Sequence, residues 1–408
     1  MGPSDIQIVG AGSLGLIFAG NILDKFHKIE IFESSNSLGG IARDFYNSEG
    51  SKFFLGCQYL QSSYLPKWAT DLNNIQHFEH RYASLTEQNG KWNYKLDFAG
   101  PAFVTGEIVN QLNRTCKNAL EDRLSLYPRE ISRILQSHIK KFLPVDIRLL
   151  HVSSLVSLGM TRISTMSGDK ELAILKKKDA LVDNLYGVSK DFLGMNFETS
   201  YIPKFGYSKY WETYTTQPIF EHKVNIKRKY KIDKKTIRET MSSLTGIKIW
   251  CADPRQIVGL TTDKKLDSLS YMVHSYGIRL DFYSGPKLPF YVNIYGTAEP
   301  LIRFYFYELD SEIKVSIDSL KKYDSSSEII AELKKIAAEA HISLKIQCQD
   351  VAYERTRRYF PISQNDHDTL TQCSINLESS NWLDSAMYNF DRKSRLDIML
   401  DQISRYSI

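Results

Sequence analysis

Cysteine is scarce in this chain. Its 408 residues include five cysteines, an odd number scattered along the sequence at Cys57, Cys116, Cys251, Cys348 and Cys373. No CxxC pair and no Cys/His pair shows the spacing of metal ligands. The sequence therefore predicts neither a disulfide framework nor a metal site, and we expect a reducing, cytoplasmic environment.

Long apolar runs and a large net charge are also lacking. No stretch reaches the ~20 continuous apolar residues of a membrane helix. The apolar segment 6–23 has no basic residues before it and contains glycines at motif spacing, so we do not expect a signal peptide. The net charge of +5 does not favour nucleic acid as a partner. The length predicts two or three lobes.

A glycine-rich motif stands at the start of the sequence. Residues 10–15 read GAGSLG, which fits GxGxxG, between a predicted strand at 5–9 and a predicted helix at 16–26. Gly10 allows a tight turn, and Gly15 lets the helix pack closely on the sheet. Gly12 has no side chain, so a pyrophosphate can approach the backbone.

The residues around this motif complete a dinucleotide-binding pattern. Ser13 and Leu14 open the helix, whose free amide groups attract phosphate. A second predicted strand at 29–32 leads into Glu33, 21 residues after Gly12. An acidic residue at this distance accepts hydrogen bonds from ribose hydroxyls and repels the extra phosphate of NADP. The sequence thus predicts a βαβ unit that binds a dinucleotide.

The continuation of this unit indicates which dinucleotide. Residues 33–43, ESSNSLGGIAR, resemble the E-x(5)-GG-x-x-R segment of many FAD proteins. These include amine oxidases, protoporphyrinogen oxidases, carotenoid desaturases and UDP-galactopyranose mutases. The resemblance implies FAD as the cofactor. It also implies that Gly39 and Gly40 pass close to the cofactor and that Arg43 meets its phosphates.

The resemblance also implies a fold. We expect an α/β protein with a Rossmann-type, glutathione-reductase-like FAD-binding domain, a discontinuous substrate domain built on an antiparallel sheet, and a helical insertion. Helical spacing of apolar residues after 106 and alternating aromatic strands at 289–317 agree with this plan. The expected parts are an FAD-binding domain (1–75, 215–265, 350–408), a helical insertion (105–150) and a substrate domain (76–104, 151–214, 266–349).

Further site residues are implied by position. The backbone of Val224 matches the family strand that contacts adenine. Gln58 stands where the mutases carry a histidine near the flavin. Arg303, amid aromatic residues, is either an exposed residue or an anion clamp. Arg358 and Tyr359 match an R-x-Y-P segment that returns to the flavin, where they either hold a substrate phosphate or the flavin edge, or anchor the loop.

The C-terminal segment departs from the family pattern. The family carries Gly-Arg where this chain has Ser379 and Ser380, although Asn389 and Asp391 of the Asn-x-Asp end remain. A charge-assisted contact to the pyrophosphate is therefore missing. Either FAD binds more weakly, or another residue such as Arg392 compensates, or the cofactor has been lost.

Three functions fit the sequence. The first is an FAD-dependent oxidoreductase of the amine oxidase type that acts on a small molecule, in which the cofactor does the chemistry. The second is a flavin-dependent nucleotide-sugar enzyme similar to UDP-galactopyranose mutase. The third is a cofactor-free binding protein on the same fold. No catalytic base can be identified from the sequence.

Overall fold

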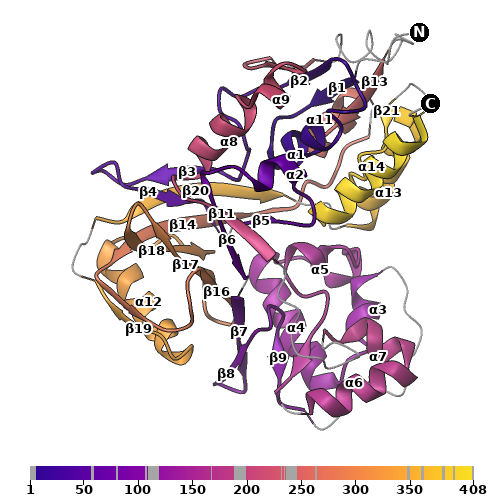
Figure 1. The fold of residues 1–408 in the computed structure, drawn as a ribbon. Helices are drawn as coiled ribbons and strands as arrows, with labels where there is room; N and C mark the ends of the chain where they lie inside the picture. Colours follow the sequence, from indigo (N-terminus) through magenta and orange to yellow (C-terminus); the bar gives the residue numbers. More distant parts are fainter. Residues whose placement is uncertain are drawn as a thin grey trace.

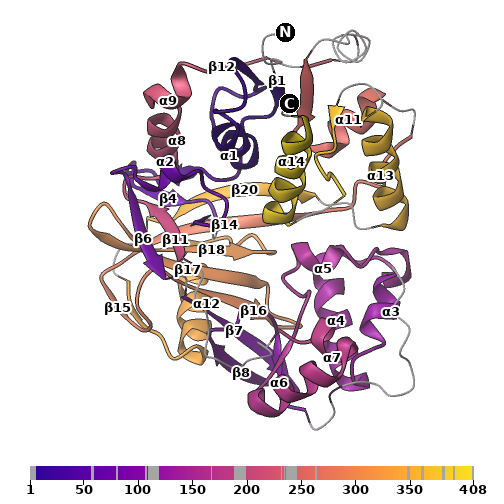
Figure 2. The same cartoon turned by 45° about the vertical axis from the view of Figure 1, so that its right-hand side comes forward.

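The chain forms three regions in the computed structural model (Figure 1). A parallel sheet with its helices contains both ends of the described chain, a large, mostly antiparallel sheet lies beneath it, and a group of helices lies beside that second sheet (Figure 2). The structure describes residues 6–56, 59–79, 81–105, 108, 119–166, 168–187, 199–230, 232–233, 235, 246–261, 264–346, 350–359, 363–378, 382–388 and 391–406.

The parallel sheet collects strands from distant parts of the chain. Its order is β12 (Val224–Lys227), β2 (Ile29–Phe32), β1 (Ile6–Val9), β13 (Ile247–Trp250) and β21 (Trp382–Leu383). All four neighbouring pairs are parallel. Three later strands of the chain, β12, β13 and β21, therefore join the two strands of the N-terminal unit, so this sheet is assembled from segments far apart in the sequence.

Helices cover both faces of this sheet. Ile8 and Ile249 pack in one hydrophobic cluster with residues of α1 (Ser13–Asn21), α8 (Tyr207–Thr215) and α14 (Arg392–Tyr406). Val9 and Trp250, one residue further along each strand, pack in another cluster with residues of α11 (Pro254–Thr261) and α13 (Gln364–Glu378). Successive strand residues point to opposite faces, so the sheet is covered on both sides. Because α8 packs with α1, it lies with this domain and not with the expected substrate domain.

The second sheet has seven strands. Their order is β20 (Ala352–Tyr359), β14 (Ser270–Leu280), β18 (Glu312–Ser319), β17 (Leu301–Leu309), β16 (Phe290–Tyr295), β7 (Arg81–Gln88) and β8 (Lys91–Leu96). Only the β16–β7 pair is parallel. One face packs on α12 (Ser326–Glu339) through residues such as Phe304 and Ile317. The opposite face carries the polar residues described below.

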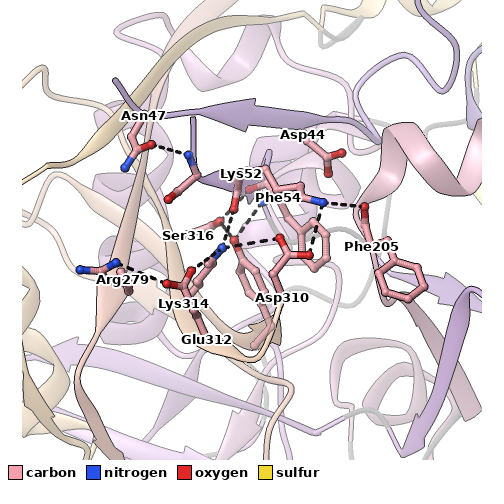
Figure 3. A network of polar contacts seen from close by, with 12 residues as sticks. Asp44, Asn47, Lys52, Phe54, Phe205, Arg279, Asp310, Glu312, Lys314 and Ser316 are labelled. Atoms are coloured by element: carbon pink, nitrogen blue, oxygen red, sulfur yellow. Dashed lines mark hydrogen bonds and ion pairs between the residues drawn. The ribbon is translucent and has the colours of Figure 1, made fainter. Parts of the chain in front are cut away.

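A hairpin connects the two sheets. Strands β3 (Asp44–Tyr46) and β4 (Lys52–Phe54) lie over the polar face of the seven-stranded sheet (Figure 3). Ser316 donates to the Phe54 carbonyl at 2.6 Å, and the Phe54 amide donates to the Tyr307 hydroxyl at 2.9 Å. Lys52 binds Asp310 at 3.3 Å. These contacts join the segment after the βαβ unit to the second sheet.

The helical region is longer than the sequence pattern predicts. It contains α3 (Leu120–Leu124), α4 (Arg129–Phe142), η1 (Ile147–Leu149), α5 (Ser154–Ser157), α6 (Asp169–Lys178) and α7 (Ala180–Leu185). Leu155, Leu172 and Leu185 share one hydrophobic cluster with Ile131 and Leu135 of α4. The boundary expected at residue 150 is therefore wrong, because the helices on both sides of it bury one common core.

Short elements complete the fold. They are β5 (Leu60–Gln61), α2 (Lys67–Thr70), β6 (Ile75–Glu79), β9 (Ala102–Phe103), β10 (Ser164–Thr165), β11 (Thr199–Pro203), α9 (Pro218–Glu221), β15 (Phe282–Ser284) and β19 (Ser343–Lys345). Within the residues that the structure describes, no helix is both long and apolar enough to cross a membrane.

Candidate functional site

The glycines of the N-terminal motif have different surroundings. Gly10 has φ +104°, and a Cβ there would lie 2.7 Å from the Ala252 nitrogen. A Cβ on Gly15 would lie 2.1 Å from the Gly10 carbonyl oxygen. A Cβ on Gly12 would meet no heavy atom within 4 Å. Gly10 and Gly15 therefore permit close packing, whereas Gly12 borders open space at the start of α1.

The second glycine pair is fixed against the first motif. The Gly39 amide donates to the Ala11 carbonyl at 2.8 Å, and the Ser13 amide donates to the Gly39 carbonyl at 3.2 Å. Both Gly39 and Gly40 have positive φ, which favours glycine. Ser13 and its neighbour Leu14 are buried. Segments 10–15 and 39–40 thus form one glycine-lined surface.

Glu33 lies at the carboxyl end of β2, beside this surface. Its carboxylate accepts hydrogen bonds from the Ala11 amide at 2.7 Å and from the Ser35 amide at 2.7 Å. Each carboxylate oxygen has more than one acceptor site, so the group can also accept from a ligand hydroxyl. The two backbone contacts hold the carboxylate in one orientation.

These residues border a cavity of about 580 Å³, which we call the first cavity. It opens at the carboxyl ends of β1, β2 and β13, where the strand order reverses direction. In open α/β sheets this is the place where ligands bind. Gly10, Gly12, Glu33 and Gly40 line it, together with Phe32, Ser34, Ile41, Tyr230, Ile232, Trp250 and Cys251.

A second cavity, of about 320 Å³, adjoins the first, because Ile41 and Asp253 line both. Four arginines contribute to its wall, Arg255, Arg357, Arg358 and Arg395, with Asp366 and Met387. Two carboxylates against four guanidinium groups leave the wall positively charged, so the second cavity favours an anionic or electron-rich ligand.

Arg395 is one of three arginines of this wall, with Arg255 and Arg357, that the sequence analysis did not identify. It lies in the first turn of α14, and its Nε donates to the Ser385 carbonyl at 2.9 Å. Its Nη2 is buried and has no hydrogen-bond partner among the residues that the structure describes. Burial lowers the pKa of this guanidinium. A buried donor without an acceptor is costly, and a ligand oxygen in the second cavity would satisfy it.

A third cavity, of about 170 Å³, adjoins the second, because Arg358 lines both. It lies between the seven-stranded sheet and the helices α4 and α5. Arg303 and Asp318 line it beside Arg358, with aromatic and other residues that include His138, Phe142, Tyr271, Asn293 and Tyr295. Sequence positions from 138 to 358 therefore meet in this one place.

The charged residues of the third cavity form a cluster. Arg303 donates to Asp318 at 2.7 Å, and the Ser275 hydroxyl donates to the same carboxylate at 2.6 Å. Burial raises the pKa of Asp318, but the guanidinium groups of Arg303 and Arg358 outweigh it, so that the net pKa lies below the ordinary value. Asp318 is therefore a carboxylate at neutral pH. The Nη2 of Arg358 is buried and finds no hydrogen-bond partner within the described part of the chain.

Several predicted residues lie away from these cavities. Arg43 forms an ion pair with Glu354 on β20 at 3.0 Å, so its side chain reaches the second sheet and not the glycine-lined surface. Asp391 caps α14 by accepting from the Ser394 amide at 2.8 Å. Val224 begins β12, opposite Ile29, and packs in the core.

Val224 therefore lies at the wrong end of its strand for contact with a ligand at the carboxyl ends. Tyr230, beyond the carboxyl end of β12, reaches the first cavity instead, and its ring lies 4.9 Å from that of Phe32. Gln58, Ser379, Ser380 and Asn389, and the side chain of Tyr359, lie outside the described residues.

The sequence matches no family model and no curated protein. Solved structures are similar in fold. A reduced UDP-galactopyranose mutase has a TM-score of 0.61 at 12% identity, covering 98% of this chain and 96% of that chain. A putrescine oxidase variant has a TM-score of 0.53 at 11% identity, with 98% of each chain covered. An oxidoreductase from Methanosarcina mazei has a TM-score of 0.50 at 9% identity, covering 98% and 99%.

These likenesses extend over nearly the whole length of each chain, whereas the identities are low. They establish the fold, and the activity has to be inferred from the residues of the site. The chain has an α/β fold similar to those of the mutase and the putrescine oxidase, with a Rossmann-type domain, an antiparallel-sheet domain and a helical region, in agreement with the fold class that the sequence predicts.

Proposed function

We propose that this protein binds FAD across the first and second cavities and acts as an oxidoreductase on a small molecule held in the third. The observation that carries the proposal is the series of three cavities, each sharing residues with the next. The series begins at a glycine-rich turn suited to a pyrophosphate and ends at a small, charged and aromatic pocket. A long cofactor with a reactive ring at one end fits such a series.

The first cavity suits the adenosine diphosphate half of FAD. Glu33 would accept from the ribose hydroxyls, because its carboxylate is already oriented by the Ala11 and Ser35 amides. Gly12 would let the pyrophosphate approach the backbone at the start of α1, where the helix dipole favours negative charge. Phe32 and Tyr230 offer aromatic rings to the adenine in place of Val224.

The second cavity suits the other half of the cofactor. Arg395 would supply the positive charge that Ser379 and Ser380 do not supply, because its buried Nη2 needs an acceptor. Arg392, the residue first considered for this role, does not belong to the described wall of either cavity. Bound FAD would supply the electron acceptor for the reaction, and the residues of the chain would bind, orient and shield the substrate.

The same cavities would also serve a flavin-dependent mutase. The third cavity argues against that alternative, because 170 Å³ is below the ~300–1,000 Å³ of pockets for drug-sized ligands, and a nucleotide sugar is larger still. The scattered cysteines support a cytoplasmic protein.

A visible spectrum of the purified protein tests the cofactor. We expect flavin absorption bands and, after denaturation, release of FAD that chromatography identifies. Protein purified without colour is incubated with FAD, FMN and riboflavin in parallel, and we expect uptake of FAD alone, because the first cavity recognises the adenosine half. A colourless protein that takes up none of the three would support the cofactor-free alternative instead.

A further inference from the structure

We propose that the substrate site in the third cavity takes a small monocarboxylate with a body about the size of a benzene ring. The inference rests on the proposed function in one respect, because it treats the second cavity as the flavin end of the cofactor site. The residues that define the ligand all belong to the third cavity.

The charge of the cavity indicates one negative charge on the ligand. Arg303 and Asp318 form a close pair, in which the two charges offset each other. Arg358 adds a second guanidinium, which leaves the cluster with one net positive charge. His138, also in the wall, is fully buried, and burial lowers its pKa well below the ordinary value, so it is neutral at pH 7. A monoanion balances this cluster.

The strand pairing directs these groups into one space. Asp318 is the direct cross-strand partner of both Arg303 and Ser275, and Arg358 is the partner of Tyr271. Direct partners point to the same face of a sheet. Ser275 and Tyr271 lie four residues apart on β14, and residues an even number apart on a strand point to the same face. Arg303, Asp318 and Arg358 therefore share one face of the sheet. Its charged side chains therefore converge on the third cavity.

Arg358 has an unused donor at this point. Its Nη2 is buried and makes no hydrogen bond to the described protein, although Asp318 and Arg303 are its neighbours. A guanidinium group presents donors in a planar fork that matches a carboxylate. Asp318 already accepts from Arg303 and Ser275. The acceptor that Arg358 lacks is supplied by a ligand carboxylate.

The size and lining of the cavity define the rest of the ligand. Its volume of about 170 Å³ is close to the ~150 Å³ of an engineered cavity that takes benzene. Phe142, Tyr271 and Tyr295 contribute ring surfaces, and Val273 and Ile302 contribute aliphatic ones. An amine would meet two guanidinium groups, and among the described wall residues the one carboxylate is Asp318. The cavity therefore selects small carboxylates over amines.

Calorimetric titration tests the proposal with three probes: benzoate, benzamide and benzylamine. We expect benzoate to bind, benzamide to bind at least about tenfold more weakly because it lacks the charge, and benzylamine to give no heat. Benzylamine or benzamide binding as tightly as benzoate, or no binding of benzoate, would overturn the proposal. The ligand comparison on the unaltered protein holds even where a variant does not fold.

A pair of variants assigns the binding to Arg358. Arg358→Gln should weaken benzoate binding at least tenfold and leave benzamide binding nearly unchanged. Arg355→Gln is the matched control, because Arg355 lies on the same strand, is exposed, and points to the opposite face. Equal benzoate affinity in Arg358→Gln and the unaltered protein would contradict the assignment.

The flavin content of each sample, read from its visible spectrum, separates the two proposals. A yellow protein that does not bind benzoate would refute the substrate class and leave FAD binding intact. A colourless protein that binds benzoate and prefers it over benzamide would refute FAD binding and support the third cavity as a carboxylate site.

Discussion

The first and third cavities are built in different ways. The glycine turn and the acidic residue of the first cavity come from one local unit, in which β1, α1 and β2 follow one another within residues 6–32 and lead into Glu33. The third cavity draws residues from α4, from the segment around α5, and from five strands of the second sheet. A local unit leaves a pattern in the sequence, whereas an assembled cavity depends on pairings that a single sequence does not display.

Of the substitutions that test this comparison, Gly15→Val in the local unit should have the largest effect on stability. Gly15→Val places a side chain on a position where even Cβ would lie 2.1 Å from a backbone oxygen. The backbone oxygen can move away only if the turn itself is distorted. We therefore expect the free energy of unfolding to fall by about 3 kcal/mol or more. Thermal and denaturant unfolding measure this. An unfolding midpoint equal to that of the unaltered protein would show that the turn is not packed as described.

The second prediction concerns the assembled cavity. Arg303→Gln leaves the buried Asp318 without its closest cation, and removing one partner of a buried pair costs about 3–5 kcal/mol. Because Arg303 is partly exposed, we expect the lower end of that range. Arg279→Gln is the control, since the Arg279–Glu312 pair is more exposed on both sides and should contribute at most about 1 kcal/mol.

The stability difference between the unaltered protein and Arg303→Gln should depend on pH, because the pKa of Asp318 is shifted. The pKa of Asp318 is lowered in the folded protein, so the pair stabilises the protein above the ordinary value of 3.8 and loses that effect as the pH falls through the lowered pKa. The stability gap between the unaltered protein and Arg303→Gln should therefore be full at pH 7 and shrink below about pH 4. Urea unfolding at several pH values measures the gap, and one that stays constant would contradict the account.

The third prediction, with a smaller effect, concerns Arg395. Arg395→Gln should weaken FAD binding by about tenfold to a hundredfold, because a hydrogen bond to a charged group contributes ~1.5–3 kcal/mol. Arg392→Gln is the matched control on the same helix, and we expect less than a threefold change. Fluorescence titration of the flavin measures both. A larger loss of FAD affinity in Arg392→Gln than in Arg395→Gln would show that Arg392, the residue suggested by the sequence, holds the cofactor.

The sequence predicts the first cavity well for a physical reason. The contact of Gly15 with the Gly10 carbonyl, the open space at Gly12 and the acid at Glu33 are local, so spacing alone specifies them, whereas the close packing of Gly10 against Ala252 is not local. Val224 shows the limit. Its strand was recognised, but which end of the strand meets the ligand depends on its register against Ile29, which only the folded sheet defines.

Long-range contacts were harder to predict for the same reason. Arg43 forms an ion pair with Glu354, more than three hundred residues away, and nothing near Arg43 in the sequence indicates that partner. In the proposed cofactor site, Arg395 supplies the charge that Ser379 and Ser380 do not supply, so a search for the family motif at those two serines would not identify it. Its place one turn into the final helix is the one signal that could have identified it.

The central claim is that Gly12 borders the cofactor and not the protein core. An equilibrium titration of FAD into cofactor-free protein, followed by flavin fluorescence, tests it directly with Gly12→Val and the control Gly259→Val. A Cβ at either position would meet no heavy atom within 4 Å, so both variants should fold. We predict that Gly12→Val abolishes FAD binding and that Gly259→Val leaves the Kd unchanged. FAD affinity retained in Gly12→Val would contradict the account.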